Sequence, residues 1–208
     1  MQRKLCIDTF VRVTEPAPAP RKLRHLDPRS LRGLAHPLRM QLLDALRRSG
    51  PATASRLAER LGESSGATSY HLRQLAAHGF VEDAPGHGKG RERWWRAVDQ
   101  GLVFDSDDFE GTGPEVRGLA ETFLHEIAAT HARELSAWLG TRERWGKDWS
   151  RSSDMSDATL RLTPELATEL VGKMRALIED YRGRVPDQDT PGSEQVRVHT
   201  HLFPVETD

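Results

Sequence analysis

The sequence of 208 residues contains a single cysteine. One cysteine cannot form a disulfide within the chain, which excludes a disulfide-stabilised secreted domain and fits a reducing cytoplasm. No run of about 18 apolar residues occurs, so the sequence predicts no membrane-spanning helix. The apolar stretch at residues 5–7 is too short and too polar for a signal peptide. Together these absences predict a cytoplasmic protein.

Two common nucleotide-binding motifs are also missing. There is no phosphate-cradling Gly-Lys-Ser/Thr loop, and no Gly-x-Gly-x-x-Gly that follows a strand and opens a helix. The glycines at positions 86, 88 and 90 lie between two predicted strands, so the helix N-terminus that would hold a dinucleotide is absent. We therefore expect no enzymatic activity and no cofactor.

The net charge of −1 hides a strong polarity along the chain. Residues 1–99 hold 18 Lys and Arg against 10 Asp and Glu, a net charge of +8, and residues 100–208 hold 12 against 21, a net charge of −9. A basic half is typical of a segment that contacts nucleic-acid phosphates, and an acidic half would be repelled by them. Ordinary surface solubility is the alternative explanation.

Residues 61–81 show the pattern of the second half of a helix-turn-helix. Leu61-Gly62 predicts a helix end, because glycine tolerates the left-handed conformation just past a helix C-terminus. Ser64 or Ser65 can then cap the next helix by accepting hydrogen bonds from its unpaired N–H groups. Gly79 ends this second helix, and an extended run follows.

The second helix is predicted to have one narrow apolar stripe and a small, polar outer face, which suits a DNA groove. At 100° per residue the apolar side carries Thr68, Leu72 and Leu75, and the outer side carries Gly66, Tyr70 and Arg73.

The flanking residues predict the rest of a winged helix. His36-Pro37 opens a helix of leucines at helical spacing through residue 48, and Gly50-Pro51 ends it before a short helix near residues 55–61. Downstream, residues 80–82 and 93–98 are predicted as two strands joined by the Gly-rich, basic turn 85–91. Three helices followed by a hairpin with a basic tip is the order of a winged helix.

On these residues the segment 31–98 resembles the ArsR-type (arsenic-repressor-like) winged-helix transcription regulators. The matching residues are Leu34, His36-Pro37-Leu38-Arg39, Leu42-Leu43, Leu57-Ala58, Leu61-Gly62, Ser64, Ser69, His71-Leu72, Leu75, Gly79 and Val81. The resemblance covers about a third of the chain. It implies a homodimer that binds a palindromic operator.

The family resemblance invites a test for metal sensing. Metal-sensing relatives carry clustered cysteines near the first helix of the motif, and the corresponding residues 55–61 contain none. His199 and His201 share one face of a predicted strand, but no third ligand is evident nearby. We therefore predict no metal site.

The predicted DNA-binding residues fall into three groups. The outer face of the second helix contributes Ser64, Ser65, Gly66, Ser69, Tyr70, His71 and Arg73, the start of the preceding helix contributes Thr53, Ser55 and Arg56, and the wing contributes Lys89, Arg91 and Arg93. Among them Arg73 is the one strong base reader, because a guanidinium can bind guanine in a bidentate manner. Solvent exposure or a pairing of Arg73 with Glu63 is the alternative.

The chain is predicted to fold as a mainly α protein with a little β structure, an α+β class. We expect a flexible N-terminal arm at 1–26, with a basic segment at 21–26, a winged helix at 27–99, a linker at 100–113 and a C-terminal dimerisation or effector domain at 114–208. That last domain should contain a long helix at 114–139, a short strand at 160–162, a helix at 164–182 and a final strand at 196–203.

The apolar face of the long helix predicts a dimer interface. Its members are Phe123, Leu124, Ile127, His131, Leu135 and Trp138. The sequence as a whole predicts a homodimeric transcriptional regulator, a repressor rather than an activator, with double-stranded DNA as its partner. The alternatives are a winged helix that docks another protein, and a regulator whose main feature is a pocket for a small-molecule effector.

Overall fold

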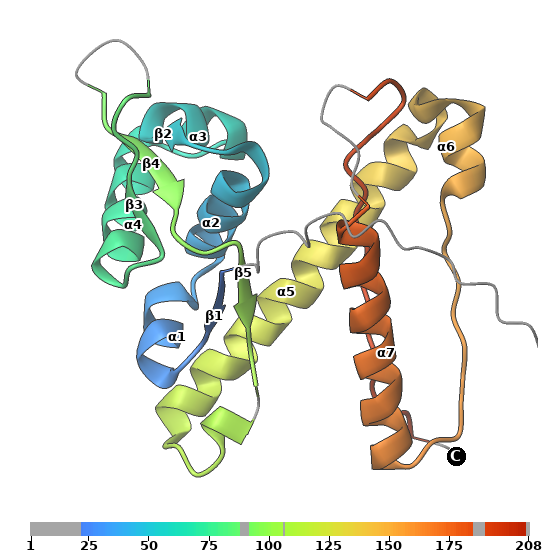
Figure 1. Ribbon diagram of the computed structural model, residues 1–208. Helices are drawn as coiled ribbons and strands as arrows, with labels where there is room; N and C mark the ends of the chain where they lie inside the picture. Colours follow the sequence, from blue (N-terminus) through green and yellow to red (C-terminus); the bar gives the residue numbers. More distant parts are fainter. Residues whose placement is uncertain (1–21, 88–91, 106, 185–189, 207–208) are drawn as a thin grey trace, which may run out of the picture. The chain divides into compact units, whose positions relative to one another are not determined.

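The computed structural model describes residues 22–87, 92–105, 107–184 and 190–206. The described chain divides into two compact units, one running up to Arg151 and the other from Ser152 onward (Figure 1). The first unit holds most of the buried side chains and all the strands. The predicted class, mainly α with a little β structure, is confirmed.

Four helices open the first unit: α1 (Pro28–Leu34), α2 (Pro37–Ser49), α3 (Ala54–Leu61) and α4 (Ser65–Ala77). Proline stands at the start of α1 and α2, where its missing N–H costs nothing. Ser64 caps α4, its Oγ accepting a hydrogen bond from the Ala67 N–H at 3.2 Å. The helices predicted at 37–48, 55–61 and from Ser64 to Gly79 are confirmed.

Glycines shape this helical layer at two turns and one crossing. Gly62 and Gly79 have φ of +69° and +70°, so they make the turns that end α3 and α4 as predicted. At Gly33 in α1, an added Cβ would lie 2.3 Å from Cγ of His78. The end of α1 therefore approaches the end of α4 closely, and a larger residue at position 33 would separate them.

Three short strands form the wing sheet, in the order β2–β4–β3 with all pairs antiparallel. They are β2 (Ala52–Thr53), β3 (Val81–Asp83) and β4 (Trp94–Ala97). In the β3–β4 hairpin Val81 lies opposite Ala97 and Asp83 opposite Trp95. The predicted hairpin is confirmed.

A second sheet corrects the interpretation of both ends of the winged helix. β1 (Leu23–His25) pairs in parallel with β5 (Gly101–Val103), with Arg24 opposite Leu102. The segment predicted as a basic arm and the start of the predicted linker are thus ordered strands. Neither segment alone has a strong strand pattern. Each forms a strand because the other supplies the partners of its backbone hydrogen bonds.

The core of the first unit extends beyond the predicted boundary at 100–113. Its fully buried side chains are those of Leu26, Leu31, Leu34, Leu42, Leu43, Leu57, Thr68, Leu72, Leu75 and Phe80. α5 (Pro114–Thr141) packs on α1 and adds Val116, Ala120 and Phe123 to the same core. An ion pair between Arg48 of α2 and Glu134 of α5 joins the helices further along. This continuity differs from the predicted start of a separate domain at residue 114.

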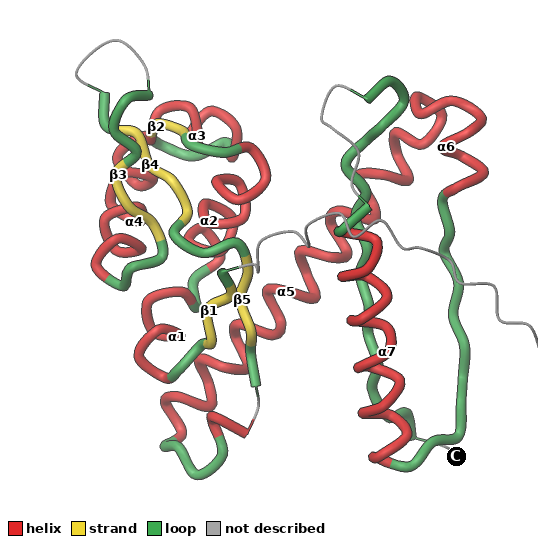
Figure 2. Tube along the Cα trace, in the orientation of Figure 1, coloured by secondary structure: helices red, strands yellow, loops and turns green. Residues whose placement is uncertain are grey.

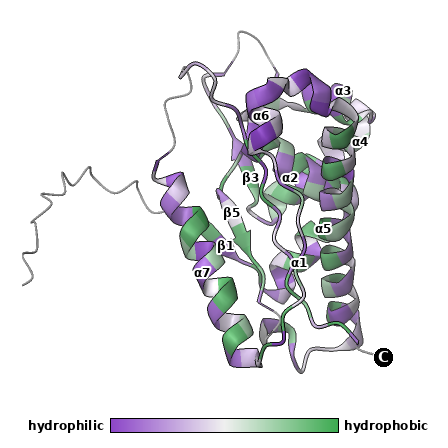
Figure 3. Cartoon of the chain, turned by 90° about the vertical axis from the view of Figure 1, so that its right-hand side faces the viewer, coloured by the Kyte–Doolittle hydropathy of each residue, from purple (hydrophilic) through white to green (hydrophobic). Residues whose placement is uncertain are grey.

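Beyond α5 the chain forms the 3₁₀ turn η2 (Arg142–Trp145) and α6 (Gly146–Ser152), and another 3₁₀ turn, η1 (Asp107–Phe109), precedes α5. The second unit contains α7 (Pro164–Arg182), capped by Thr163, whose Oγ1 accepts from the Leu166 N–H. The predicted helix at 164–182 is confirmed, and its apolar residues recur along its length (Figure 3).

The strands predicted at 160–162 and 196–203 are wrong. Figure 2 shows both segments as loop, and the described residues from Ser152 onward contain no strand. A strand forms only in a ladder with a neighbouring strand, and in the described residues neither segment belongs to such a ladder. The alternating pattern therefore leaves Val196 and Val198 65% and 59% exposed instead of burying them.

Candidate nucleic-acid interface

The helix α4 presents the two faces that its sequence predicts. Thr68, Leu72 and Leu75 are fully buried, whereas Tyr70 is 53% exposed and Arg73 lies in solvent. Ser64, Ser65 and Gly66 are exposed at its N-terminus, and Ser69 and His71 flank the outer face half-buried. The exposed face thus combines small residues, which allow close approach, with one guanidinium.

A shallow depression of about 300 Å³ lies where α4, the start of α3 and the base of the wing meet. Its lining includes Ser55, Ser69, Arg73, Arg93 and Trp95. Two guanidinium groups, three hydroxyls and the carboxylate of Glu92 line a space open to solvent. The cations and hydroxyls suit a phosphate group beside a recognition helix. The structure therefore brings together members of all three predicted DNA-binding groups.

Thr53 differs from its predicted role in contacting phosphate. It is only 2% exposed, and its Oγ1 accepts a hydrogen bond from the Arg56 N–H at 3.3 Å, so this hydroxyl caps α3. Ser55 and Arg56 are exposed as a phosphate contact requires, and the guanidinium of Arg56 lies 4.8 Å from the centre of the Trp94 ring. Trp94 thereby holds Arg56 next to the depression.

Of the three predicted wing contacts the structure describes Arg93, and this cation is already paired. Arg93 donates to both carboxylate oxygens of Asp83 across the hairpin and lies 4.0 Å from the centre of the Trp95 ring. The hydrogen bond from Arg93 holds the pKa of Asp83 below its ordinary value, so this carboxylate stays ionised at neutral pH. The other two predicted wing contacts, Lys89 and Arg91, lie outside the described residues.

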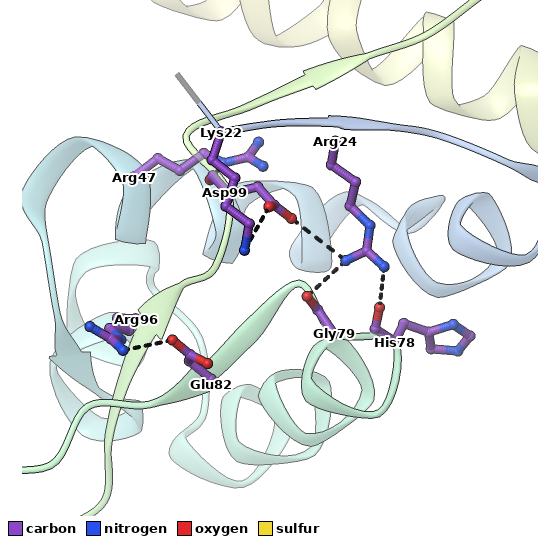
Figure 4. A network of polar contacts seen from close by, with 8 residues as sticks. All are labelled: Lys22, Arg24, Arg47, His78, Gly79, Glu82, Arg96 and Asp99. Carbon is purple, nitrogen blue, oxygen red and sulfur yellow. Dashed lines mark hydrogen bonds and ion pairs between the residues drawn. The ribbon is translucent and has the colours of Figure 1, made fainter. Parts of the chain in front are cut away.

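A polar network ties the C-terminus of α4 to the β1–β5 sheet (Figure 4). Arg24 of β1 donates to the carbonyl oxygens of His78 and Gly79, at 2.9 and 2.7 Å, and so satisfies groups that the helix end leaves unpaired. Its guanidinium also lies 3.8 Å from the carboxylate of Asp99, which Lys22 approaches to 3.4 Å. The segment before α1 therefore helps to position α4, a role that the sequence interpretation missed because it depends on a contact 54 residues away.

Replacing Asp99 by Asn should lower the free energy of unfolding by about 1–3 kcal/mol, because its nearly buried carboxylate faces two cations. Urea denaturation measures the change. The control is Glu82→Gln, which breaks the ion pair with Arg96 between two half-exposed side chains and should cost less than about 1 kcal/mol. Equal effects of the two substitutions would show that Asp99 does not hold the network.

The predicted dimer residues on α5 divide into two groups. Phe123 is 2% exposed and packs 5.5 Å from Phe104, so it belongs to the core of its own chain and is unavailable to a partner. Leu124 and Leu135 are 48% and 40% exposed. Ile127, His131 and Trp138 lie between or beyond them, half-buried. The five predicted residues other than Phe123 recur every three or four positions, so they lie along one side of the helix.

The second unit has a groove of about 190 Å³ between α7 and the segment near Thr200. This volume is below the range of about 300–1,000 Å³ that is usual for small-molecule sites. Within the described residues, no group of three His, Cys, Asp or Glu side chains is placed to hold a metal ion. None of the described helices has the length and apolarity that a membrane crossing requires.

A family model described as a helix-turn-helix domain matches residues 34–84, from the last residue of α1 to the residue after β3. The matched segment contains α3, the Gly62 turn and α4, followed by the first strand of the wing hairpin. This part of the chain is a winged helix-turn-helix domain. The chain is accordingly a DNA-binding transcriptional regulator.

Several solved structures are similar to this helix-turn-helix domain and the residues that flank it. An ArsR-like transcriptional regulator from Rhodococcus sp. RHA1 is 30% identical, over 52% of this chain and 85% of that one, with a TM-score of 0.30. The antimony-specific transcriptional repressor AntR is 27% identical, over 50% and 78%, with a TM-score of 0.32. The homodimeric winged helix-turn-helix domain Mb0332 of Mycobacterium bovis is 23% identical, over 51% and 81%, with a TM-score of 0.31. Comparison with curated proteins yields no match.

Proposed function

We propose that this chain is a homodimeric transcriptional repressor that binds a palindromic operator through α4. The observation that carries the proposal is the exposed face of α4, where small residues surround Arg73 beside a depression that Arg73 and Arg93 line. A helix of this kind fits the major groove, in which a guanidinium reads guanine and the flanking groups hold phosphates. As a regulator of bacterial type it would act in the cytoplasm.

The exposed seam of α5 supports the dimer. Leu124, Leu135 and Leu139 expose between 38% and 48% of their surface, an arrangement that a second copy of the same helix would cover. Two copies would present two α4 helices to successive major grooves, about 34 Å apart, and the dyad between them explains a palindromic operator. One monomer offers few contacts, so the second copy supplies the affinity.

Selection of bound sequences from random duplex DNA tests the proposal. The recovered duplexes should share an inverted repeat, and their affinity should fall steeply with salt, because each phosphate contact displaces counterions. If the protein recovers no common sequence and binds neutral and anionic polymers equally well, the proposal is wrong. A winged helix that docks another protein would then gain support.

Replacing Arg73 by Ala should reduce the preference for the selected sequence over random duplex by ~1–3 kcal/mol, because a bidentate contact to guanine is lost. Competition binding at constant salt measures the preference. The matched control is Arg117→Ala, which removes the same charge from an exposed position on α5. An unchanged preference in the Arg73 variant would remove the base-reading role from this residue.

The repressor and effector roles need separate measurements. Reporter expression from a promoter that carries the selected sequence should fall when the protein is present, and an increase would make it an activator. A thermal-shift screen of small molecules tests whether the protein binds an effector. A ligand that raises the melting temperature and changes operator affinity would support the alternative in which such a pocket is the main feature.

A further inference from the structure

Three side chains that can carry positive charge meet where the start of α2 packs against the middle of α4. The rings of His36 and His71 lie 4.4 Å apart, centre to centre, and Arg39 faces both of them. Tyr70 completes the group, its ring 5.1 Å from that of His71 in an edge-on arrangement. All but the exposed Tyr70 are half-buried.

The charge of Arg39 is not compensated within the described chain. Among the described residues its guanidinium makes no hydrogen bond or ion pair, and its Nε is buried without a partner. Among the described residues, the carboxylate of Glu63 acts on His71 and not on Arg39. A half-buried guanidinium without a partner is costly, so an anion from outside the chain would stabilise it.

The cluster lies on the flank of α4 opposite the depression at the wing. Ser69 and Arg73 face the depression, whereas His71 is about 200° of helix rotation from Ser69. A helix in the major groove runs between two phosphate backbones about 12 Å apart. With α4 in the groove, the depression would face one backbone and the cluster the other.

We propose that His36, Arg39 and His71 bind a backbone phosphate of the DNA strand on the side of α4 away from the wing, and that His71 takes up a proton as they do so. This inference rests on the proposed DNA binding through α4. Arg39 supplies a bidentate cation. His36 supplies an N–H, because its Nδ1 accepts from the Leu38 N–H at 3.2 Å and its proton therefore resides on Nε2.

The proton uptake follows from the surroundings of His71. Partial burial, and then the neighbouring His36 and Arg39, hold the pKa of His71 below 6.5, and Glu63 offsets only part of this. A phosphate on Arg39 would favour the imidazolium and raise that pKa. Between the lower pKa of the free protein and the higher pKa of the complex, binding takes up a proton, so affinity increases as pH falls.

The first experiment measures binding of a mixed-sequence duplex against salt concentration. Arg39→Gln should reduce the slope of log K against log salt by about 0.9 and weaken binding to all sequences alike. Arg39→Lys keeps the charge and should keep the slope. If Arg39→Gln binds with the salt slope of the wild type while Arg73→Ala loses sequence preference, the phosphate site proposed for the cluster is wrong and the proposed function stands.

The second experiment measures the same binding against pH. In the wild type, affinity should rise up to tenfold per pH unit as pH falls through the window around and below ~6.5. His71→Gln should flatten this dependence. His36→Asn keeps a cap for α2 and should weaken binding with a smaller pH dependence, and the control His125→Gln on the exposed side of α5 should behave as wild type.

Stability measurements separate binding from a purely structural role. The free protein favours neutral His71, so its melting temperature should fall as pH drops below ~6.5, while its affinity for DNA rises. The proposal would be overturned if the melting temperature and the affinity for DNA both fell as pH drops. It would also be overturned if the affinity of His71→Gln for DNA depended on pH as that of the wild type does. A further result would overturn the proposal. In it, inorganic phosphate raises the melting temperature of the wild type but not of Arg39→Gln, and Arg39→Gln still binds DNA as the wild type does. No salt-dependent DNA binding by any variant would instead refute the proposed function.

Discussion

Leu135→Glu is expected to convert the protein into a monomer and to lower its affinity for the selected operator by about 10²- to 10⁴-fold. Leu135 is 40% exposed in the C-terminal half of the apolar seam on α5, where a partner copy would bury it. A carboxylate there would have to lose its water without a cation to receive it. Sedimentation measures the mass, and competition binding measures the affinity.

The loss in affinity follows from linkage between the two recognition helices. In a dimer, binding of one α4 holds the second at high effective concentration over its own half-site. A monomer retains only the contacts of a single half-site. The variant should therefore still bind one half-site with the affinity and salt dependence of a wild-type monomer.

A neighbouring substitution provides the control for Leu135→Glu. Ser136→Glu introduces the same charge at an exposed position about 100° round the helix. This variant should remain dimeric and bind the operator as the wild type does. If both variants remain dimeric, the interface lies elsewhere, and the role proposed for the seam of α5 is wrong.

Phe80→Ala is expected to lower the free energy of unfolding by about 3–5 kcal/mol. Phe80 is fully buried between the end of α4 and the start of β3, and the guanidinium of Arg24 lies 4.3 Å from its ring centre. Removing the ring would leave a cavity under the recognition helix and would also remove the surface on which Arg24 rests. Chemical denaturation of the variant and the wild type measures the difference.

The same substitution at an exposed site shows whether burial is the cause. Phe203 is 69% exposed, and Phe203→Ala should change the free energy of unfolding by less than about 0.5 kcal/mol. A comparable loss in both variants would mean that Phe203 is covered in solution. A loss under 1 kcal/mol in Phe80→Ala would contradict the tight packing beneath α4.

The helix-turn-helix could be predicted because its signals are local. Ser64 caps α4, Gly62 and Gly79 end their helices, and the spacing of Leu72 and Leu75 orients α4. Each of these effects acts within one or two helical turns, so the sequence carries it directly. The predicted faces of α4 agree with the observed burial for the same reason.

The partners of individual side chains could not be predicted in this way. The sequence pattern predicts Arg24 in a flexible arm, yet Arg24 binds the end of α4. The pattern predicts Phe123 in a partner interface, yet Phe123 packs into the core of its own chain. The pairing of His36 with His71 joins positions 35 residues apart. Such contacts depend on how the helices cross, which no spacing within one element encodes.

The sequence by itself determined the order of helices and hairpin, the turns between them and the outer face of α4, because backbone conformation and helical periodicity are properties of neighbouring residues. Tertiary structure alone decided that β1 and β5 form a sheet, that residues 196–203 do not form a strand, and where the charges of Arg39 and Asp99 lie. Strand pairing and the pairing of buried charges need partners distant in the chain, and only packing of the whole unit brings those partners together.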